Sequence, residues 1–285
     1  MLFISFMAMQ SKVSDPYQAL RYKEFRFYII ARFCITIALT MQAVTIGYEV
    51  YELSNSKLLL GLIGLTEAIP AIGIALYGGY VADKSEKRNL LITAISVYTV
   101  LCGLLLFFTH SYGIQEFGKA QVVKVIFVVI FLTGVARSFS GPSSYALVAQ
   151  IIPKEVYQSA ITWSSSAWQL GAVLGPAVGG ILLGWMGITF TFFMIITLLI
   201  IAIGCLLMVE RKPVLYVPAG EGAIESAMQG LRFVFKNKVI LSCITLDLFA
   251  VLFGGAIALL PVYAKDILKV GPEGLGWLRA AQAIG

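Results

Sequence analysis

The chain consists of long apolar runs separated by short polar segments. Seven of the runs are as long as the roughly 20 residues that a helix needs to cross the hydrocarbon core of a bilayer. They are residues 27–50, 58–81, 90–109, 122–146, 158–183, 188–209 and 239–263. An eighth begins near Leu275 and reaches the last residue, Gly285. We expect the chain to be a fragment of a longer protein, because a span that stops within the bilayer leaves main-chain carbonyls without partners.

The apolar runs divide the chain into four parts. We expect a cytoplasmic tail at 1–26, a six-helix membrane domain at 27–209, a cytoplasmic connection at 210–238 and the start of a second membrane domain at 239–285. Within the connection, apolar residues recur at the three- and four-residue spacing of one helix face: Ile224, Met228, Leu231 and Phe235. This spacing is typical of an amphipathic helix on the membrane surface, and a linker packed against its own bundle is an equal alternative. The layout predicts an all-α membrane protein with two halves of six helices.

Composition supports this class and excludes a soluble domain. Hydrophobic residues make up 59% of the chain and charged residues 13%, and the mean hydropathy is +0.88. The net charge of +6 could indicate a nucleic-acid partner, but the basic residues are distributed by loop. One side of the predicted membrane holds most of them, and the other side holds only Lys57, Lys119, Lys124, Lys265 and Lys269. This asymmetry predicts a cytoplasmic N-terminus and requires no nucleic-acid partner.

Other candidate chemistry is sparse. The cysteines lie in apolar runs without paired spacing, so we expect neither a disulfide nor a metal site. They are Cys34, Cys102, Cys205 and Cys243. The single histidine, His110, lies at the outer end of the third run. Since the sequence has no HExxH or GxSxG motif, we expect neither an enzyme nor a cofactor.

A charged segment, GGYVADKSEKR at 78–88, connects the second run to the third. Gly79 would allow a neighbouring helix to approach closely, and Asp83 could complement the N-terminus of a helix. Lys84, Lys87 and Arg88 could hold that carboxylate or contact anionic lipid headgroups. A simple positively charged cytoplasmic turn explains the bases but not the aspartate.

The fifth run holds four glycines and a proline within ten residues, GAVLGPAVGG at 171–180. Gly171, Gly175 and Gly179 recur every four residues and share one face of a helix, which allows close helix contact. Pro176 lacks an N–H and removes one hydrogen bond of the helix. The stretch predicts a bent and tightly packed fifth helix. The alternative, a general small-residue interface, accounts for the glycines but not for the proline.

These two segments resemble motifs of the major facilitator superfamily. The places of its motif between the second and third helices are occupied by Gly79, Asp83, Lys84, Lys87 and Arg88, with Glu86 where the family usually has a second glycine. The fifth-helix signature of its antiporters is met by Gly171, Gly175, Pro176, Gly179 and Gly180. The resemblance implies a 12-helix fold, of which this chain would hold the N-terminal six-helix half, the seventh helix and the start of the eighth. It also implies that segment 78–88 latches an inner gate.

An arginine in the fourth run is a candidate for proton coupling. Arg137 resembles the family's fourth-helix arginine, although Ser140 and Ser143 stand where the family has glutamine and glycine. A charge at this depth is costly and usually faces a bundle interior or an aqueous cavity. The alternative is that the side chain extends to the inner membrane surface.

Carboxylates within the runs are the other ionisable candidates. Glu67 and Asp247 could bind protons or a cationic substrate, because burial favours the protonated form of a carboxyl group. A structural ion pair, with Arg32 or with the arginine of the fourth run, is the alternative. For Glu49 and Glu52, near the outer end of the first run, we expect a solvated position at the interface.

The resemblance also suggests a function. The run LDLFAVLFGGAIALLPVYAKDIL followed by GPEGLGWLRA is similar to a branch that contains enterobactin-type siderophore exporters and macrolide efflux pumps. We expect a monomeric, proton-coupled antiporter in the bacterial inner membrane that exports a drug-like or siderophore-like molecule by alternating access. Aromatic residues could line its cavity or simply pack: Tyr48, Tyr51, Trp163 and Trp168. The alternatives are a proton-coupled uptake symporter, which the fifth-helix signature disfavours, and a non-transporting membrane receptor or assembly protein.

Overall fold

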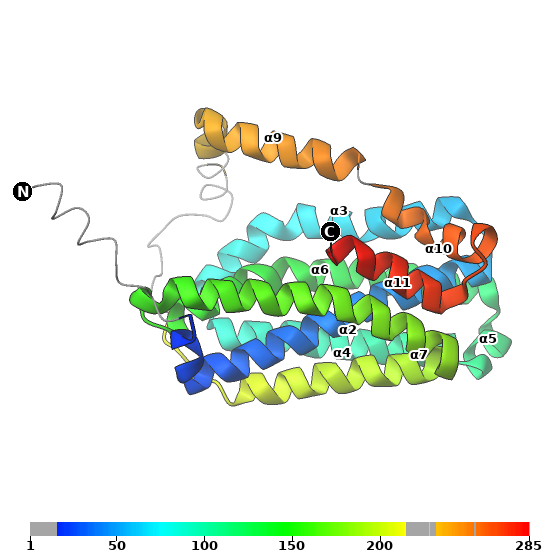
Figure 1. Ribbon diagram of the computed structural model, residues 1–285, viewed down its shortest axis with the longest axis horizontal. Coiled ribbons are helices and arrows are strands. Elements are labelled where there is room, and N and C mark those ends of the chain that lie inside the picture. The colour runs from blue at the N-terminus through cyan, green and yellow to red at the C-terminus, as the bar shows by residue number, and fades with distance from the viewer. Residues whose placement is uncertain (1–15, 215–227, 229–231, 254, 285) are drawn as a thin grey trace, which may run out of the picture.

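A computed structural model describes residues 16–214, 228, 232–253 and 255–284, and its centre is a bundle of long helices (Figure 1). The long helices are α2 (Lys23–Ser54), α3 (Lys57–Lys84), α4 (Lys87–Thr109), α6 (Lys119–Ile151) and α7 (Tyr157–Leu207). Shorter helical segments of this part are η1 (Gln18–Arg21), α5 (Ser111–Phe117) and η2 (Lys154–Val156). All five long helices have the length and the apolar composition to cross a membrane. Since the described residues include no strand, the prediction of an all-α membrane protein is confirmed.

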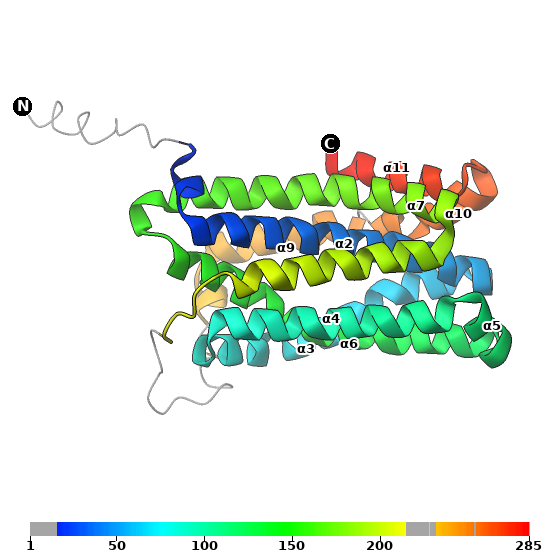
Figure 2. The same cartoon turned by 90° about the horizontal axis from the view of Figure 1, so that it is seen from below.

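Helix α7 contains two of the predicted spans. Its backbone is helical on both sides of Gly187, whose φ of 76° and ψ of 178° lie outside the helical region. A residue without a Cβ adopts a positive φ at little cost, so the chain can reverse here without a loop. The two parts of α7 run back along the bundle from this point (Figure 2). They correspond to the fifth and sixth apolar runs.

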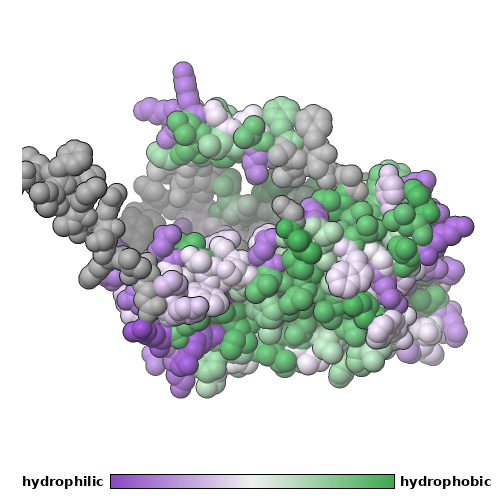
Figure 3. All heavy atoms as spheres, in the orientation of Figure 1, coloured by the Kyte–Doolittle hydropathy of each residue, from purple (hydrophilic) through white to green (hydrophobic). Residues whose placement is uncertain are grey.

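The helices pack around one apolar core. Helix α2 lies along α7, α3 lies along α6, and α4 contacts both α6 and α7. Phe25, Tyr28, Ile95, Ile126 and Phe192 come from four different helices and are almost completely buried in this core. The outer surface is apolar as well, as the hydrophobic residues across the middle of the bundle show in Figure 3. Because lipid is as apolar as these side chains, close packing holds the helices together more than removal from water does.

The C-terminal segment differs from its prediction. Instead of one helix over 239–263, α9 (Lys238–Phe253) is followed by a 3-10 turn η3 (Gly255–Leu259), the short α10 (Leu260–Val262) and a π-turn η4 (Tyr263–Ile267). Gly255 is entropically unfavourable in a helix, and Pro261 cannot donate a main-chain hydrogen bond. Helix α11 (Gly271–Ile284) then begins one turn before the predicted start near Leu275, because Pro272 suits the first turn of a helix.

The C-terminal helices differ in how closely they pack against the bundle. Elements α10 and α11 pack against α2, and α11 also lies along α7, whereas α9 lies apart from the bundle (Figure 1). The predicted amphipathic helix at 224–235 falls largely outside the described residues, and 232–236 is helical. The predicted tail 1–26 is described from Pro16, whose carbonyl oxygen accepts a 2.9 Å hydrogen bond from Nε1 of Trp163.

Candidate functional site

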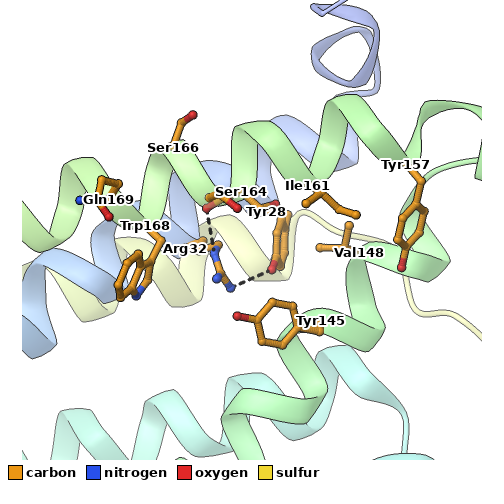
Figure 4. A pocket seen from close by; sticks show the side chains of 11 residues that line it. Tyr28, Arg32, Tyr145, Val148, Tyr157, Ile161, Ser164, Ser166, Trp168 and Gln169 are labelled. Atoms are coloured by element: carbon orange, nitrogen blue, oxygen red, sulfur yellow. Dashed lines mark hydrogen bonds between the residues drawn. The ribbon is translucent and has the colours of Figure 1, made fainter. Parts of the chain in front are cut away.

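A cavity of about 630 Å³ lies between α2, α6 and α7, near the end of the bundle where α2 begins (Figure 4). We call this the inner end, and the end where α2 meets α3 the outer end, after the orientation that the charge pattern predicts. The lining side chains are polar, aromatic or aliphatic, and one of them is charged. They are Tyr28, Arg32, Tyr145, Val148, Tyr157, Ile161, Ser164, Ser165, Ser166, Trp168 and Gln169. The cavity therefore offers aromatic faces and hydrogen-bonding groups around one cation.

Arg32 is the charged residue of this cavity, and neutral groups hold it in place. Its Nη1 donates a 3.0 Å hydrogen bond to Oγ of Ser144, and its Nε donates one of 3.3 Å to the carbonyl oxygen of Ser164. Its guanidinium lies 5.2 Å from the centre of the Tyr145 ring, a distance at which a cation is attracted to an aromatic face. Tyr28 donates to the carbonyl oxygen of Ser144 at 3.1 Å. The described residues that line this cavity include no carboxylate, so none of them compensates the charge of Arg32 there.

Among the aromatic residues that sequence suggested for a cavity, Trp168 lines it. Trp163 instead binds Pro16 through its indole nitrogen, and Tyr51 donates a hydrogen bond to the carboxylate of Asp266. Tyr48 packs at the junction of α2 with the C-terminal segment. These positions separate the four aromatics into one cavity residue and three packing residues.

Glu67 and Arg137 form an ion pair across α3 and α6. Nη1 of Arg137 lies 2.6 Å from Oε1 of Glu67, with exposed side-chain fractions of 66% and 32%. The helices can cross closely here because Gly134 faces α3, where an added Cβ would lie 2.8 Å from Cγ of Pro70. The pairing was one of the two alternatives for Glu67. Arg32, the other possible partner, lies in the cavity instead.

Asp247, the other carboxylate proposed for coupling, is not part of this arrangement. It lies on α9 with an exposed side chain. It makes no hydrogen bond or ion pair with another described residue. The structure thus brings Glu67 and Arg137 together but leaves Asp247 and Arg32 apart from them.

The charged segment 78–88 makes contacts that sequence did not predict. Nζ of Lys87 donates to the main-chain oxygen of Asp83 at 2.8 Å, rather than to its carboxylate. Arg88 donates from Nε and Nη2 to the carbonyl oxygens of Leu206 and Leu207, both at 2.9 Å. Both basic side chains are buried, so the expectation that they contact lipid headgroups is wrong for them. The charge of the Asp83 carboxylate acts on Lys87, as expected, although the hydrogen bond goes to the main chain. Each instead satisfies carbonyls that the end of a helix leaves without partners, at α3 and at α7 respectively.

The other predicted residues of this segment are less buried than Lys87 and Arg88. The side chain of Asp83 is exposed, and Nζ of Lys84 lies 4.3 Å from the centre of the Tyr80 ring. The prediction that Gly79 meets a neighbouring helix is wrong for the described residues, because no atom lies within 4 Å of an added Cβ there. Gly78 makes the close contact instead, against the backbone of Ser138. One residue along a helix turns the side-chain direction by about 100°, which separates the two glycines.

The glycines of the fifth helix meet two different partners. An added Cβ at Gly171 would lie 2.8 Å from Cβ of Thr36, and one at Gly179 would lie 3.1 Å from Cα of Met41, both on α2. At Gly180 it would lie 2.7 Å from Cα of Gly276 on α11. Gly175 faces α2 as well, and the backbone remains helical through Pro176 and departs only at Gly187. The stretch therefore packs closely against α2 of the bundle on one side and against α11 of the C-terminal segment on the other.

Polar contacts join these same parts at the outer end. Nζ of Lys265 lies 2.7 Å from Oε2 of Glu52, and Tyr51 binds Asp266. Sequence reasoning expected Glu52 to be solvated and did not pair it. The only sequence signal was the placement of opposite charges at the outer ends of two predicted spans. A third contact, 2.7 Å long, runs from Nε1 of Trp185 on α7 to Oε1 of Glu273 on α11.

The side chain of Glu52 is 49% exposed, in line with its predicted solvated position, whereas Glu49 departs from that prediction. The residue is only 8% exposed, although it lies one turn from Glu52. Among the described residues, no group of three or more His, Cys, Asp or Glu side chains could hold a metal ion.

Comparison with known proteins assigns the chain to a family. The family model described as Major Facilitator Superfamily matches residues 28–285. Multidrug resistance protein MdtG of Klebsiella pneumoniae (strain 342) is 28% identical over 209 residues, which are 73% of this chain and 47% of that protein. Putative multidrug resistance protein MdtD of Enterobacter sp. (strain 638) is 33% identical over 104 residues, 36% of this chain and 20% of that protein. This chain thus matches less than half of the length of either relative.

A solved structure agrees on the fold. The POT family transporter PepTSo aligns with a TM-score of 0.57 over 92% of this chain and 54% of that one, at 16% sequence identity. At this identity the likeness concerns the fold alone. Since the family model covers nearly the whole chain, including the glycine-rich fifth helix and the 78–88 segment, the protein is an integral membrane protein that belongs to the Major Facilitator Superfamily.

Proposed function

We propose that the protein is a secondary transporter that exports a small molecule by alternating access, in exchange for protons. The observation that carries this proposal is the difference between the two ends of the bundle. A cavity of about 630 Å³ lies at the inner end, while the pairs Glu52–Lys265 and Trp185–Glu273 join the two parts of the chain at the outer end. The second cavity, of about 560 Å³ at the outer end, is lined by residues of α2, α3 and α6 within the bundle and does not separate these two parts. A transporter that is closed outside and accessible from inside has this arrangement in one state of its cycle.

The packing of the fifth helix supports exchange rather than uptake. Gly171 and Gly179 lie against α2, and Gly180 lies against α11. A helix packed on both sides through glycine allows two bodies to move against each other without large side chains interlocking. This is the segment that meets the fifth-helix signature of antiporters, and antiport is therefore preferred over symport.

The ion pair of Glu67 and Arg137 supports proton coupling. Protonation of Glu67 would remove the charge that binds Arg137, and release of the proton would restore it. A proton and a conformational change could be linked through such a pair, because its strength depends on the charge of one member. Asp247 remains a second candidate for proton coupling, because it lies in the seventh apolar run. Asp83, whose side chain is exposed, is proposed to contact the second half at the inner gate.

The lining of the cavity supports an aromatic or amphipathic substrate. Tyr28, Tyr145, Tyr157 and Trp168 supply aromatic faces, and serines supply hydrogen-bonding groups. A drug-like or siderophore-like molecule combines these same features, and both relatives are named as multidrug resistance proteins. We place the protein as a monomer in the bacterial inner membrane, with its N-terminus in the cytoplasm.

The test uses inverted vesicles that contain the full-length protein and carry a pH gradient. Hydrophobic drugs and catecholate siderophores are added one at a time, and proton release is recorded. Wild type is compared with Glu67→Gln and Asp247→Asn, and Glu116→Gln serves as the control because Glu116 is an exposed carboxylate on α5. We expect a substrate-evoked signal in wild type and in the control, and its loss in Glu67→Gln.

Other outcomes have distinct meanings. Loss of the signal only in Asp247→Asn would move proton coupling to α9. A proton flow in the same direction as the substrate would indicate symport. Equal and full activity in all variants would contradict a coupling role for either carboxylate, and a silent panel together with silent uptake assays would favour a receptor or assembly protein.

A further inference from the structure

The second cavity of the bundle has no part in the proposed transport mechanism. It lies at the outer end, where α2 ends and where α3 and α6 begin, and its volume is about 560 Å³. Most of the described residues that line it are apolar, and the charged ones among them are two lysines. The residues that matter here are Leu53, Leu59, Lys119, Val123, Lys124 and Phe127. The cavity thus combines apolar walls with two positive charges.

The two lysines have no counter-charge in the described part of the chain. Lys119 and Lys124 are exposed, and neither makes a hydrogen bond or an ion pair with another described residue. Lys265, at the same end of the bundle, differs because it pairs with Glu52. Glu116, the acid that precedes Lys119 by three residues, is exposed on α5 and pairs with neither lysine. Two positive charges therefore meet at one cavity without a protein anion between them.

Their depth matches that of the lipid headgroups. Lys119 is the first residue of α6, and Lys124 lies five residues further on, about 7–8 Å deeper at about 1.5 Å per residue. The headgroup layer on each side of a bilayer is about 5–7 Å thick. Lys124 also lies two residues inside the apolar run 122–146. An unpaired charge at the edge of the hydrocarbon is costly, so its ammonium group favours a nearby phosphate.

The apolar wall of the cavity continues along α6 beyond Phe127. Val128 and Phe131 are 59% and 44% exposed, and together with Lys124 and Phe127 they follow the spacing of one helix face. A positive charge therefore stands at the outer end of an exposed apolar stripe. A small soluble anion would use the charge alone, whereas a molecule with an anionic head and a hydrocarbon tail uses both features.

We propose that this cavity binds an anionic phospholipid of the outer leaflet. Its phosphate lies between the ammonium groups of Lys119 and Lys124, and the start of an acyl chain follows Phe127 and Phe131. The first turn of α6 adds to the attraction, because its N-cap Gly118 supplies no side-chain hydrogen bond and free N–H groups at a helix start favour anions. This site does not depend on the direction or the coupling of transport.

The test counts bound lipids on the full-length protein. The protein is delipidated in detergent and mixed with equal amounts of phosphatidylglycerol and phosphatidylcholine that carry the same acyl chains, and native mass spectrometry gives the affinity for each. We expect a preference for phosphatidylglycerol. Each lysine near a phosphate should contribute about fivefold, so Lys119→Gln and Lys124→Gln together should lower that affinity by about 30-fold.

Matched variants separate the site from general surface charge. Lys57→Gln with Lys269→Gln removes two positive charges from the same side, outside the cavity lining, and should keep the preference. Lys124→Arg keeps the charge and should bind as wild type does. Ala120→Trp keeps both lysines but fills the cavity and should weaken binding. Thermal unfolding without lipid shows which variants are folded, and lipid should raise the unfolding temperature only where it binds.

Four results would overturn the inference. They are equal binding of both lipids, no binding of either lipid, an equal loss in the Lys57 and Lys269 variant, and displacement of the lipid by millimolar glycerol phosphate. The last result would make the cavity a site for a soluble anion. The vesicle assay for proton release does not involve these lysines, so the proposed function would stand in each case.

Discussion

Replacing Gly180 with alanine places a methyl group where α7 meets α11. The new Cβ would lie 2.5 Å from the main-chain oxygen of Pro272 and 2.7 Å from Cα of Gly276, whereas ordinary contact begins at 3.4 Å. The atoms in question belong to the backbone and cannot rotate away, so the two helices must separate by up to about 1 Å. Overpacking of this kind costs about 1–3 kcal/mol.

This cost falls on the closed outer end, because the three atoms nearest to an added Cβ at Gly180 all belong to the C-terminal segment. Since about 1.4 kcal/mol corresponds to a factor of ten, Gly180→Ala should lower the ratio of closed to open molecules by about five- to 150-fold. The assay is an electron–electron distance measurement between nitroxide labels at two exposed positions, Lys57 on α3 and Ile267 in η4, in full-length protein whose native cysteines are replaced. Thermal unfolding of the same samples accompanies it. The unfolding temperature should change little if the open form packs as well as the closed one.

Two other glycines are matched controls. Gly171→Ala creates a clash with Thr36 inside the bundle and should lower thermal stability without shifting the closed-to-open ratio. Gly73→Ala on α3 meets no atom within 4 Å and should leave both quantities near wild type. Equal ratios in Gly180→Ala and Gly73→Ala would refute the reasoning that the glycine contact is needed for closure.

Three further predictions follow from single contacts. Arg88→Met removes two hydrogen bonds to carbonyls at the end of α7 and should lower the free energy of unfolding by about 1.5–3 kcal/mol in chemical denaturation; an unchanged midpoint would contradict a capping role. Glu52→Lys should reduce closure by about two- to fivefold, and adding Lys265→Glu should restore it, while a double variant as open as the single one would show that the pair does not act. Tyr145→Leu should weaken binding of an aromatic substrate by about two- to fivefold in a direct binding assay, with Tyr112→Leu, far along the chain on α5, as the control that should not.

The amino-acid sequence by itself determined the helices and their membrane character. An apolar run of about 20 residues in lipid has to satisfy its own backbone hydrogen bonds, and a helix does so locally. For this reason the first six spans correspond to α2, α3, α4, α6 and the two parts of α7. The spacing of Gly171, Gly175 and Gly179 also predicted a face for close packing, because side-chain direction on a helix depends on local geometry alone.

Local rules were less reliable where several weak effects compete. The seventh run is apolar apart from Asp247 and a few small polar residues, yet α9 ends at Phe253. A 3-10 turn, the short α10 and a π-turn follow it up to Ile267. A single glycine or proline inside a helix is often tolerated, so hydropathy could not tell which one would interrupt it.

Only the tertiary structure decided the partners and the burial of single side chains. Lys87 and Arg88 bind main-chain carbonyls at helix ends, Glu67 meets Arg137, and Glu49 is buried one turn from the half-exposed Glu52. These outcomes depend on how far each helix is rotated about its axis and on which helix lies beside it. Contacts between residues about 70 to 215 positions apart set that rotation, and no local pattern contains them. In a membrane this choice has large consequences, because a charge that finds no partner in the bundle cannot rely on water instead.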